Sequence, residues 1–165
     1  MVFRKEKIVI VTLGNELRGD DGAGILFGNL VRGKIPLKVI NGGDAPENYI
    51  GPISNECPET ILVVDAMNFG GEPGDSALFS YKSLEKDSVS THGSLKLFAE
   101  FLERITCARL LILGIQPERL GLGEKISPLV KVGVKNLAEK FIDSVETSHT
   151  IEPFFDSYER KNSNG

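Results

Sequence analysis

Ile8-Val9-Ile10-Val11-Thr12-Leu13 and the adjoining Gly14-Asn15-Glu16-Leu17-Arg18-Gly19-Asp20-Asp21-Gly22-Ala23-Gly24 decide the fold of this chain. The first segment is continuous, apolar and rich in β-branched residues, which is typical of a strand covered on both faces. The second segment is a glycine-rich loop that leads into a helical pattern at residues 21–31. A buried strand that passes through a loop into a helix indicates the start of an alternating α/β arrangement.

The same alternation continues along the chain. Further strands are predicted at residues 37–40, 60–66 and 107–113, and further helices at residues 46–53, 94–105 and 127–145. Residues 77–81 follow a Gly-Glu-Pro-Gly turn and are predicted to return as an antiparallel strand at a sheet edge. Strands that alternate with helices predict an α/β fold, in which a mostly parallel sheet lies between two layers of helices.

Three details of this pattern concern single side chains. Ser127 is predicted to cap the last helix, with Pro128 at its first position. Cys107 opens a predicted strand and is expected to be a small buried hydrophobic residue. The helix at residues 94–105 is predicted to bury one apolar face, which consists of Leu95, Phe98, Phe101, Leu102 and Ile105.

The chain has the size of one domain. Its 165 residues, 41% of them hydrophobic, are enough to bury roughly two-thirds of the surface of the unfolded chain. We expect a single α/β domain at residues 1–146 and a polar, partly disordered C-terminal tail at residues 147–165. Phe154 and Phe155, which lie in this tail, could still dock on a surface or a partner.

Charge and composition disfavour several classes of protein. The net charge of −4 argues against a nucleic-acid-binding protein, which normally carries a basic face. No segment approaches the ~20 consecutive apolar residues that a membrane span needs. Cys57 and Cys107 show neither a zinc-ligand spacing nor a disulfide framework, so reduced thiols are expected. We therefore expect a cytoplasmic protein with no nucleic-acid or membrane partner.

Three potential metal ligands lie at corresponding places of the predicted fold. Glu16 follows the first strand, Asp65 ends the apolar run at residues 61–64, and His92 precedes the helix at residues 94–105. In open parallel sheets, ligands bind beyond the carboxyl ends of the strands, where the strand order reverses. If the two strands are neighbours, about 4.8 Å apart, Glu16 and Asp65 can share one ion. Two carboxylates and an imidazole suit nickel or zinc, and the ligands alone do not choose between them.

The glycine-rich loop does not fit a nucleotide site. Gly14 and Gly19 have the spacing of the first two glycines of a phosphate-binding loop. However, Asp20 and Asp21 follow, where that loop needs Lys and Ser or Thr. Two carboxylates would repel a triphosphate, so we do not expect nucleotide binding at this loop.

Five motifs occur in order along the chain. They are Gly14 to Gly24, Ala45-Pro46-Glu47-Asn48, Val64-Asp65-Ala66 with Pro73-Gly74, Ser90-Thr91-His92, and Gly114-Ile115-Gln116-Pro117. Together they resemble the motifs of the hydrogenase maturation endopeptidases, which process the large subunit of nickel–iron hydrogenases. The resemblance covers residues 8–145 and is closest to the branch that serves hydrogenases of the formate-hydrogenlyase type.

This resemblance implies a three-layer α/β/α sandwich around a five-stranded, mostly parallel mixed sheet. It implies an endopeptidase that removes the C-terminal extension of a nickel–iron hydrogenase large-subunit precursor after nickel insertion. The metal-binding residues of the family fall on Glu16, Asp65 and His92, which are therefore the expected catalytic residues. Nickel is expected as the recognition element, presented by the precursor, which is the expected partner. Nothing in the resemblance covers the tail beyond residue 147.

Each of the three ligands has an alternative role. Glu16 could be a solvated loop carboxylate, Asp65 could cap a turn, and His92 could cap the helix that begins near Ser94. A non-enzymatic chaperone could also use the same ligands to check for nickel without hydrolysis. A peptidase that acts on an unrelated protein would need the same ligands and a different surrounding surface. No Ser-His or Cys-His pair stands out, so a covalent acyl-enzyme is not expected.

Four further polar residues are expected to have structural roles. Asp20 and Asp21 are expected to cap the helix that follows them and to hold the loop through backbone hydrogen bonds. Asn15 and Gln116 are expected to hold backbone near the site and not to take part in catalysis.

Overall fold

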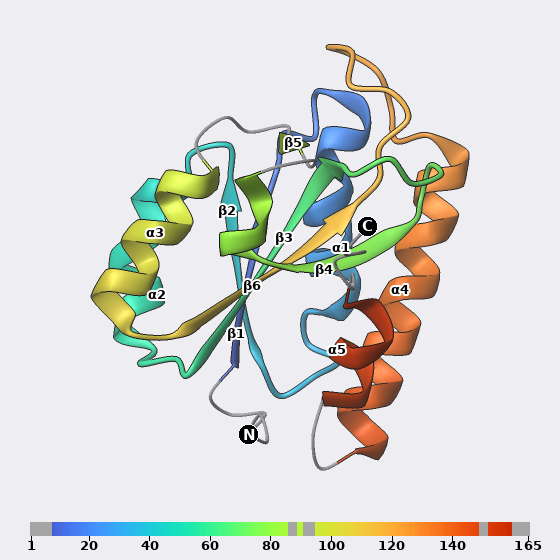
Figure 1. The fold of residues 1–165 in the computed structure, drawn as a ribbon. Helices are drawn as coiled ribbons and strands as arrows, with labels where there is room; N and C mark the ends of the chain where they lie inside the picture. The colour runs from blue at the N-terminus through green and yellow to red at the C-terminus, as the bar shows by residue number, and fades with distance from the viewer. Residues whose placement is uncertain (1–7, 86–88, 91–94, 149–151, 160–165) are drawn as a thin grey trace, which may run out of the picture.

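A mixed β-sheet runs through the centre of the protein, with helices on both of its faces (Figure 1). The computed structural model describes residues 8–85, 89–90, 95–148 and 152–159. The main strands lie in the order β2-β1-β3-β6-β4, and all neighbours are parallel except β4 and β6. They are β1 (Ile8–Leu13), β2 (Lys38–Gly43), β3 (Thr60–Asn68), β4 (Ser76–Ser80) and β6 (Arg109–Ile115). The predicted five-stranded mixed sheet and its antiparallel edge strand are confirmed.

A short additional strand lengthens one end of this sheet. Strand β5 (Val89–Ser90) pairs antiparallel with the last two residues of β3, as Met67 pairs with Ser90 and Asn68 with Val89. The sequence did not predict this strand, because two residues are too short to show any alternation of polar and apolar side chains. Strand β5 brings the chain back to the carboxyl end of β3.

Two layers of helices cover the sheet, as predicted. One layer consists of α1 (Ala23–Val31), α4 (Pro128–Thr147) and α5 (Glu152–Tyr158), and the other consists of α2 (Ile50–Asn55) and α3 (Leu95–Thr106). Three 3-10 helices connect the larger elements: η2 (Gly19–Gly22), η3 (Pro46–Tyr49) and η4 (Tyr81–Glu85). Alternate residues of β3 serve the two cores, since Leu62 packs with α1 and α4 while Val63 packs with α2 and α3.

The strand order reverses at the carboxyl ends of β1 and β3. From β1 the chain passes through α1 to β2 on one side, and it then returns through α2 to β3 on the other side. Thr12 of β1 pairs with Val64 of β3, so the two strands end at the same edge of the sheet. This edge is the place where an open α/β sheet usually binds its ligand.

Helix α3 buries a narrower face than the sequence predicted. Leu95, Phe98 and Leu102 are buried against the sheet, in agreement with the prediction. Phe101 and Ile105, however, are 50% and 44% exposed. The predicted face was too wide, because apolar spacing shows which residues can face a core and not how far the neighbouring elements extend.

Cys107 is exposed, contrary to the prediction that it would be a small buried residue. Strand β6 begins at Arg109, and Cys107 instead terminates helix α3. Its φ of 55° is in the left-handed region, and its amide donates to the carbonyl oxygen of Glu103 at 2.9 Å. These features are typical of a residue that ends an α-helix by adopting the left-handed conformation, a position that glycine usually occupies.

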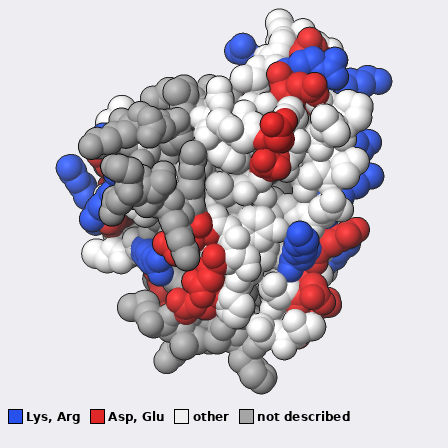
Figure 2. Space-filling model, turned by 45° about the vertical axis from the view of Figure 1, so that its right-hand side comes forward, with Lys and Arg blue, Asp and Glu red and all other residues white. Residues whose placement is uncertain are grey.

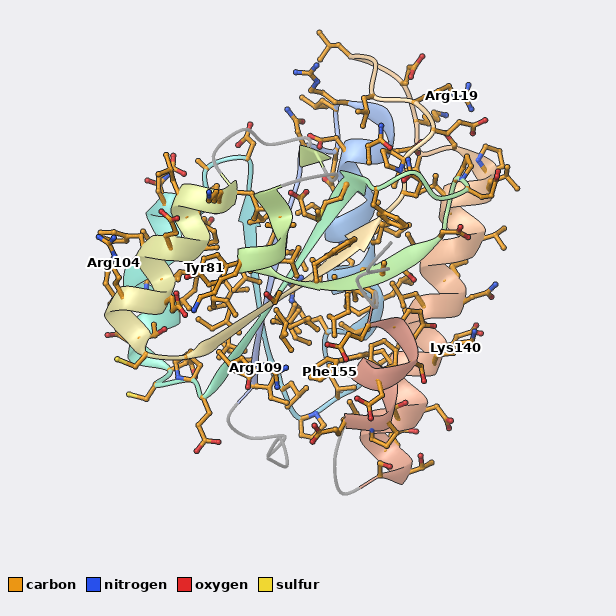
Figure 3. The ribbon with its side chains drawn as sticks, viewed as in Figure 1. Tyr81, Arg104, Arg109, Arg119, Lys140 and Phe155 are labelled. Carbon is orange, nitrogen blue, oxygen red and sulfur yellow. The ribbon has the colours of Figure 1, made fainter. Side chains whose placement is uncertain are left out.

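The C-terminal segment packs on the same core as the rest of the domain. Helix α5 buries Phe154 and Phe155, both 4% exposed, and Figure 3 shows Phe155 between α5 and the sheet. The rings of Phe154 and Phe141 of α4 meet edge to face, with centroids 5.0 Å apart. Glu159 forms a bridge with Leu78 at the outer edge of β4. The packing therefore extends past the expected domain boundary at residue 146, because α5 covers apolar surface that α4 and β4 leave open.

Among the helices within the described ranges, none is long and apolar enough to cross a membrane.

Candidate active site

Glu16 lies on a loop that is closed by its own hydrogen bonds. The amide of Asn15 donates to Oδ2 of Asp21 at 3.1 Å, and the amide of Leu17 donates to Oδ1 of Asn15 at 2.9 Å. The amide of Arg18 donates to the carbonyl oxygen of Asn15 at 3.1 Å. The backbone on both sides of Glu16 is therefore held in place, while its side chain is exposed and accessible to a ligand. The expected backbone role of Asn15 is consistent with these contacts.

Two glycines allow this loop and the start of α1 to lie close to the ends of β1 and β3. A Cβ on Gly22 would lie 3.2 Å from Cα of Glu16. A Cβ on Gly24 would lie 2.7 Å from the carbonyl oxygen of Leu13 and 2.5 Å from that of Val64. Side chains at these positions would push the loop outward, so the glycines bring the backbone of Glu16 close to the switch point.

Asp65 is completely buried in strand β3, at 0% exposure. It follows Val64, whose partner is Thr12 of β1, and it pairs with Gly114 of β6. Strand β3 continues to Asn68, so the backbone of Asp65 lies within a strand and not in a turn. A carboxylate is costly to bury without compensating interactions. Its position at the switch point favours a functional role.

His92 lies outside the described residues, so its position stays a prediction. The closest described residue is Ser90 of β5, which pairs with Met67 of β3. Met67 is two positions after Asp65, and Ser90 is two positions before His92. The described backbone therefore ends, two residues before His92, beside the strand that carries Asp65.

Asp20 joins the loop of Glu16 to a distant part of the chain. Its carboxylate, at 0% exposure, accepts hydrogen bonds from the amides of Glu118 and Arg119, both at 2.8 Å. It also accepts from the amide and the hydroxyl of Ser127 at 2.6 and 2.7 Å. Burial raises the pKa of Asp20, but these hydrogen bonds outweigh burial and lower the pKa below its ordinary value of 3.8. Asp20 is therefore a buried anion that ties two loops together.

The prediction that Asp20 and Asp21 cap the following helix was wrong. The N-cap of α1 is Gly22, and no side chain donates or accepts a capping hydrogen bond there. Asp20 instead bonds to Ser127, the N-cap residue of α4. The predicted backbone hydrogen bonds of the two aspartates are confirmed, as Asp21 accepts from Asn15 within the loop.

Gln116 connects the ends of β3 and β6. Its Oε1 accepts hydrogen bonds from the amides of Phe69 and Gly71 at 2.9 and 3.1 Å. Its Nε2 donates to Oδ1 of Asn68 at 3.2 Å. The expected role of Gln116 in holding backbone is confirmed. It shapes the segment that follows Asn68, the last residue of β3.

The structure brings Glu16 and Asp65 to the same edge of the sheet, from two adjacent strands. Within the described ranges, no group of three or more His, Cys, Asp or Glu side chains is arranged to hold a metal ion. The role of Glu16 and Asp65 as metal ligands therefore stays a prediction. Sequence reasoning missed the link from Asp20 to Ser127, because the two residues are 107 positions apart and neither carries a local signal of the other.

The fold and the site can now be compared with known proteins. A profile of the hydrogenase maturation proteases matches residues 30–144, a range that includes Asp65. The chain belongs to the hydrogenase maturation protease family. Over 136 residues it is 31% identical to the hydrogenase 3 maturation protease of Escherichia coli K12, covering 80% of this chain and 86% of that protein. The family predicted from the five motifs is confirmed.

Solved structures of hydrogenase maturation proteases share the fold. The crystal structure of the nickel–iron hydrogenase maturation protease HycI from Thermococcus kodakarensis KOD1 has a TM-score of 0.78 and 34% identity. That match covers 87% of this chain and 94% of the other. The solution structure of the endopeptidase HycI from Escherichia coli has a TM-score of 0.73 and 26% identity, and the match covers 87% and 93% of the two chains. The predicted three-layer α/β/α architecture is confirmed.

Proposed function

We propose that this hydrogenase maturation protease removes the C-terminal extension of a nickel–iron hydrogenase large-subunit precursor after nickel insertion. The observation that supports the proposal is the place of Glu16 and Asp65 at the switch point of the sheet. Glu16 lies in the loop after β1, and Asp65 lies in the adjacent strand β3, one residue past its last pair with β1. A protease that recognises nickel in its substrate needs a site that can engage both a metal and a peptide bond. The two carboxylates lie where such a site is expected.

We further propose that nickel enters the site as part of the substrate. The donors offered by Glu16 and Asp65, with His92 as the third, are oxygen and imidazole ligands that suit a divalent metal. None is a thiolate, so the protein by itself should bind nickel weakly compared with a thiolate-rich site. Nickel carried by the precursor would polarise the scissile carbonyl group. The exposed carboxylate of Glu16 would contact the nickel-bearing surface of the precursor, and the buried carboxylate of Asp65 would orient the nickel.

The test is an incubation of the protein with nickel-loaded and nickel-free cognate precursor, followed by intact-mass measurement. We expect the nickel-loaded precursor to lose the mass of its extension and the nickel-free precursor to remain whole. The protein should purify largely without nickel, and a chelator added after the two partners meet should inhibit little. Efficient cleavage of nickel-free precursor in the presence of chelator would rule out recognition of nickel and leave the protease assignment intact.

The same experiment separates the protease from a nickel-checking chaperone. A chaperone would bind nickel-loaded precursor in a stable complex, and the mass of the precursor would not change. A protease releases a shortened product and turns over. A precursor-to-enzyme ratio of ten or more makes the distinction clear, because a non-catalytic binder cannot shorten more molecules than it binds.

A further inference from the structure

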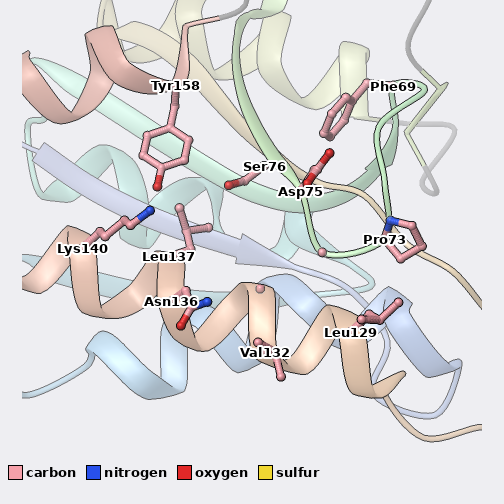
Figure 4. A pocket seen from close by; sticks show the side chains of 12 residues that line it. Phe69, Pro73, Asp75, Ser76, Leu129, Val132, Asn136, Leu137, Lys140 and Tyr158 are labelled. Atoms are coloured by element: carbon pink, nitrogen blue, oxygen red, sulfur yellow. The ribbon is translucent and has the colours of Figure 1, made fainter.

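A groove lies between helix α4 and the segment that leads into β4. Its volume is about 440 Å³. Figure 4 shows the side chains that line it, with Phe69 and Pro73 toward one end and Lys140 and Tyr158 toward the other. Ser76, the first residue of β4, also lines it. None of the functions discussed above uses this groove.

One end of the groove begins at the carboxyl edge of the sheet. Ser76 pairs with Ile115, the last residue of β6, and the amide of Gly74 donates to the carbonyl oxygen of Gln116 at 2.9 Å. Phe69 is the first residue after β3, the strand that carries Asp65. The groove therefore starts at the sheet edge where the candidate active site lies, and it runs along α4 away from that edge.

The walls suit an extended peptide. Strand β4 is at the edge of the main sheet, and among the described residues no strand pairs with the outer side of Ser76 and Ala77, before the bridge of Leu78 with Glu159. Helix α4 lines the groove from Leu129 to Lys140, which corresponds to roughly 16 Å, or about five residues of extended chain. A Cβ on Gly133 would lie 2.3 Å from the carbonyl oxygen of Gly74, so α4 and the segment before β4 are in direct contact at this point.

Lys140 gives the far end of the groove a positive charge. Tyr158 also lines this end, and Figure 4 shows the polar ends of the two side chains pointing toward one another. The ion pairs found within the described residues involve Lys38 and Lys82, so the charge of Lys140 is not neutralised by a described carboxylate. Asp75 lies toward the opposite end. Basic and acidic side chains are otherwise interspersed over this face of the molecule (Figure 2).

We propose that this groove binds the end of the precursor's C-terminal extension, with the terminal carboxylate at Lys140 and Tyr158. The inference rests on the proposed function. A lysine ammonium and a tyrosine hydroxyl together supply charge-assisted hydrogen bonds to a carboxylate. An extended chain that leaves the candidate active site along α4 reaches them with its last few residues. Tyr158 lies beyond residues 30–144, which match the family profile, so this end of the groove would help to select the precursor.

The test is binding of a fluorescent peptide with the sequence of the last ten residues of the cognate precursor. The peptide is compared as a free acid and as a C-terminal amide, by anisotropy, without any cleavage. We expect the free acid to bind the full chain roughly tenfold more tightly than the amide, the effect of one charge-assisted contact. Lys140→Gln should abolish this preference, and Tyr158→Phe should reduce it. Lys135→Gln, an exposed lysine of α4 outside the groove, should preserve it.

Equal binding of acid and amide, or an unchanged preference in Lys140→Gln, would overturn the proposal, as would the absence of peptide binding. Processing of whole precursor provides an independent readout. Lys140→Gln should raise KM and leave kcat unchanged, because the carboxylate is far from the scissile bond. If precursor is cleaved normally but the peptide does not bind, the groove is wrong and the proposed protease function stands. If the peptide binds as expected but no precursor is cleaved, the proposed protease function is wrong and the groove still binds the peptide.

Discussion

The carboxylate of Asp20 accepts two hydrogen bonds from Ser127, one from the amide at 2.6 Å and one from the hydroxyl at 2.7 Å. Ser127 is the N-cap residue of α4, so this contact joins the loop of Glu16 to the helix that forms one wall of the groove. Because Asp20 is buried and charged, the junction is rigid only while all its donors are in place. The position of Glu16 therefore depends on a residue that does not itself belong to the candidate ligand set.

Asp20→Asn should destabilise the fold by about 3 kcal/mol at neutral pH, because an amide would place N–H groups against backbone N–H donors. The native pKa of Asp20 is below 3.8, so its stabilisation is present above that pH and is lost as the pH falls through the native value. The difference in unfolding free energy between wild type and Asp20→Asn should therefore narrow below pH 3.8. Chemical denaturation at several pH values measures it. Asp143→Asn, at an exposed position, is the control, and its unfolding free energy should change with pH as that of wild type does.

Asp65→Asn should remove precursor processing, because it preserves the shape of the side chain and removes the charge that a metal ligand needs. Folding should survive, as the amide fills the same buried space. Glu16→Gln should likewise lower processing at least about 100-fold, equivalent to roughly 2.7 kcal/mol. The control is Glu139→Gln, an exposed glutamate of α4. Wild-type rates in a folded Asp65→Asn protein would show that the site has been misassigned.

Gly22→Ala should lower processing with little change in stability. Its Cβ would lie 3.2 Å from Cα of Glu16, which must then move by a few tenths of an ångström. The φ of Gly22 is −80°, so the backbone itself accepts alanine. Gly51→Ala is the matched control. Gly51 lies in helix α2, and an added Cβ would have no neighbouring atom within 4 Å. Equal processing rates for the two variants would contradict the role given to Gly22.

Deletion of residues 148–165 should lower the melting temperature strongly. The sequence alone favoured the opposite result, because residues 147–165 were expected to be a polar tail. Phe154→Ala and Phe155→Ala should each cost about 3 kcal/mol through the cavity that remains. Ser157→Ala is the control, since this residue is exposed on the same helix. A melting temperature that is unchanged by the deletion would show that α5 does not contribute to the stability of the core.

Cys107→Gly should keep or raise stability, by up to about 1 kcal/mol, because glycine adopts the left-handed conformation without steric strain. Cys107→Val should lower stability, since a β-branched residue is poorly compatible with a φ of 55°. Thermal unfolding of both variants measures the effect. If Cys107→Val is as stable as Cys107→Gly, the C-cap assignment is wrong. Both variants should process precursor normally, because Cys107 lies before the first residue of β6, and Gly114, the partner of Asp65, lies near the other end of that strand.

The sequence by itself determined the elements and the places of two potential ligands. Continuous β-branched runs predicted β1 and β3, and a turn before residue 77 predicted the antiparallel edge strand. Because each strand end is a local feature, the sequence also placed Glu16 and Asp65 directly beyond or at the end of buried strands. These predictions depend only on neighbouring residues, whose periodicity reflects the local backbone conformation.

Only the tertiary structure decided which distant segments meet. The order of the strands makes β1 and β3 neighbours, and this brings the loop of Glu16 to the strand of Asp65. The tertiary structure also decided that Asp20 bonds to Ser127, that α5 packs on the core, and that Phe101 is exposed. A local pattern shows that a surface is apolar or that a carboxylate is available. The partner is selected by the packing of the whole chain, in which contacts between distant segments compete for the same surface.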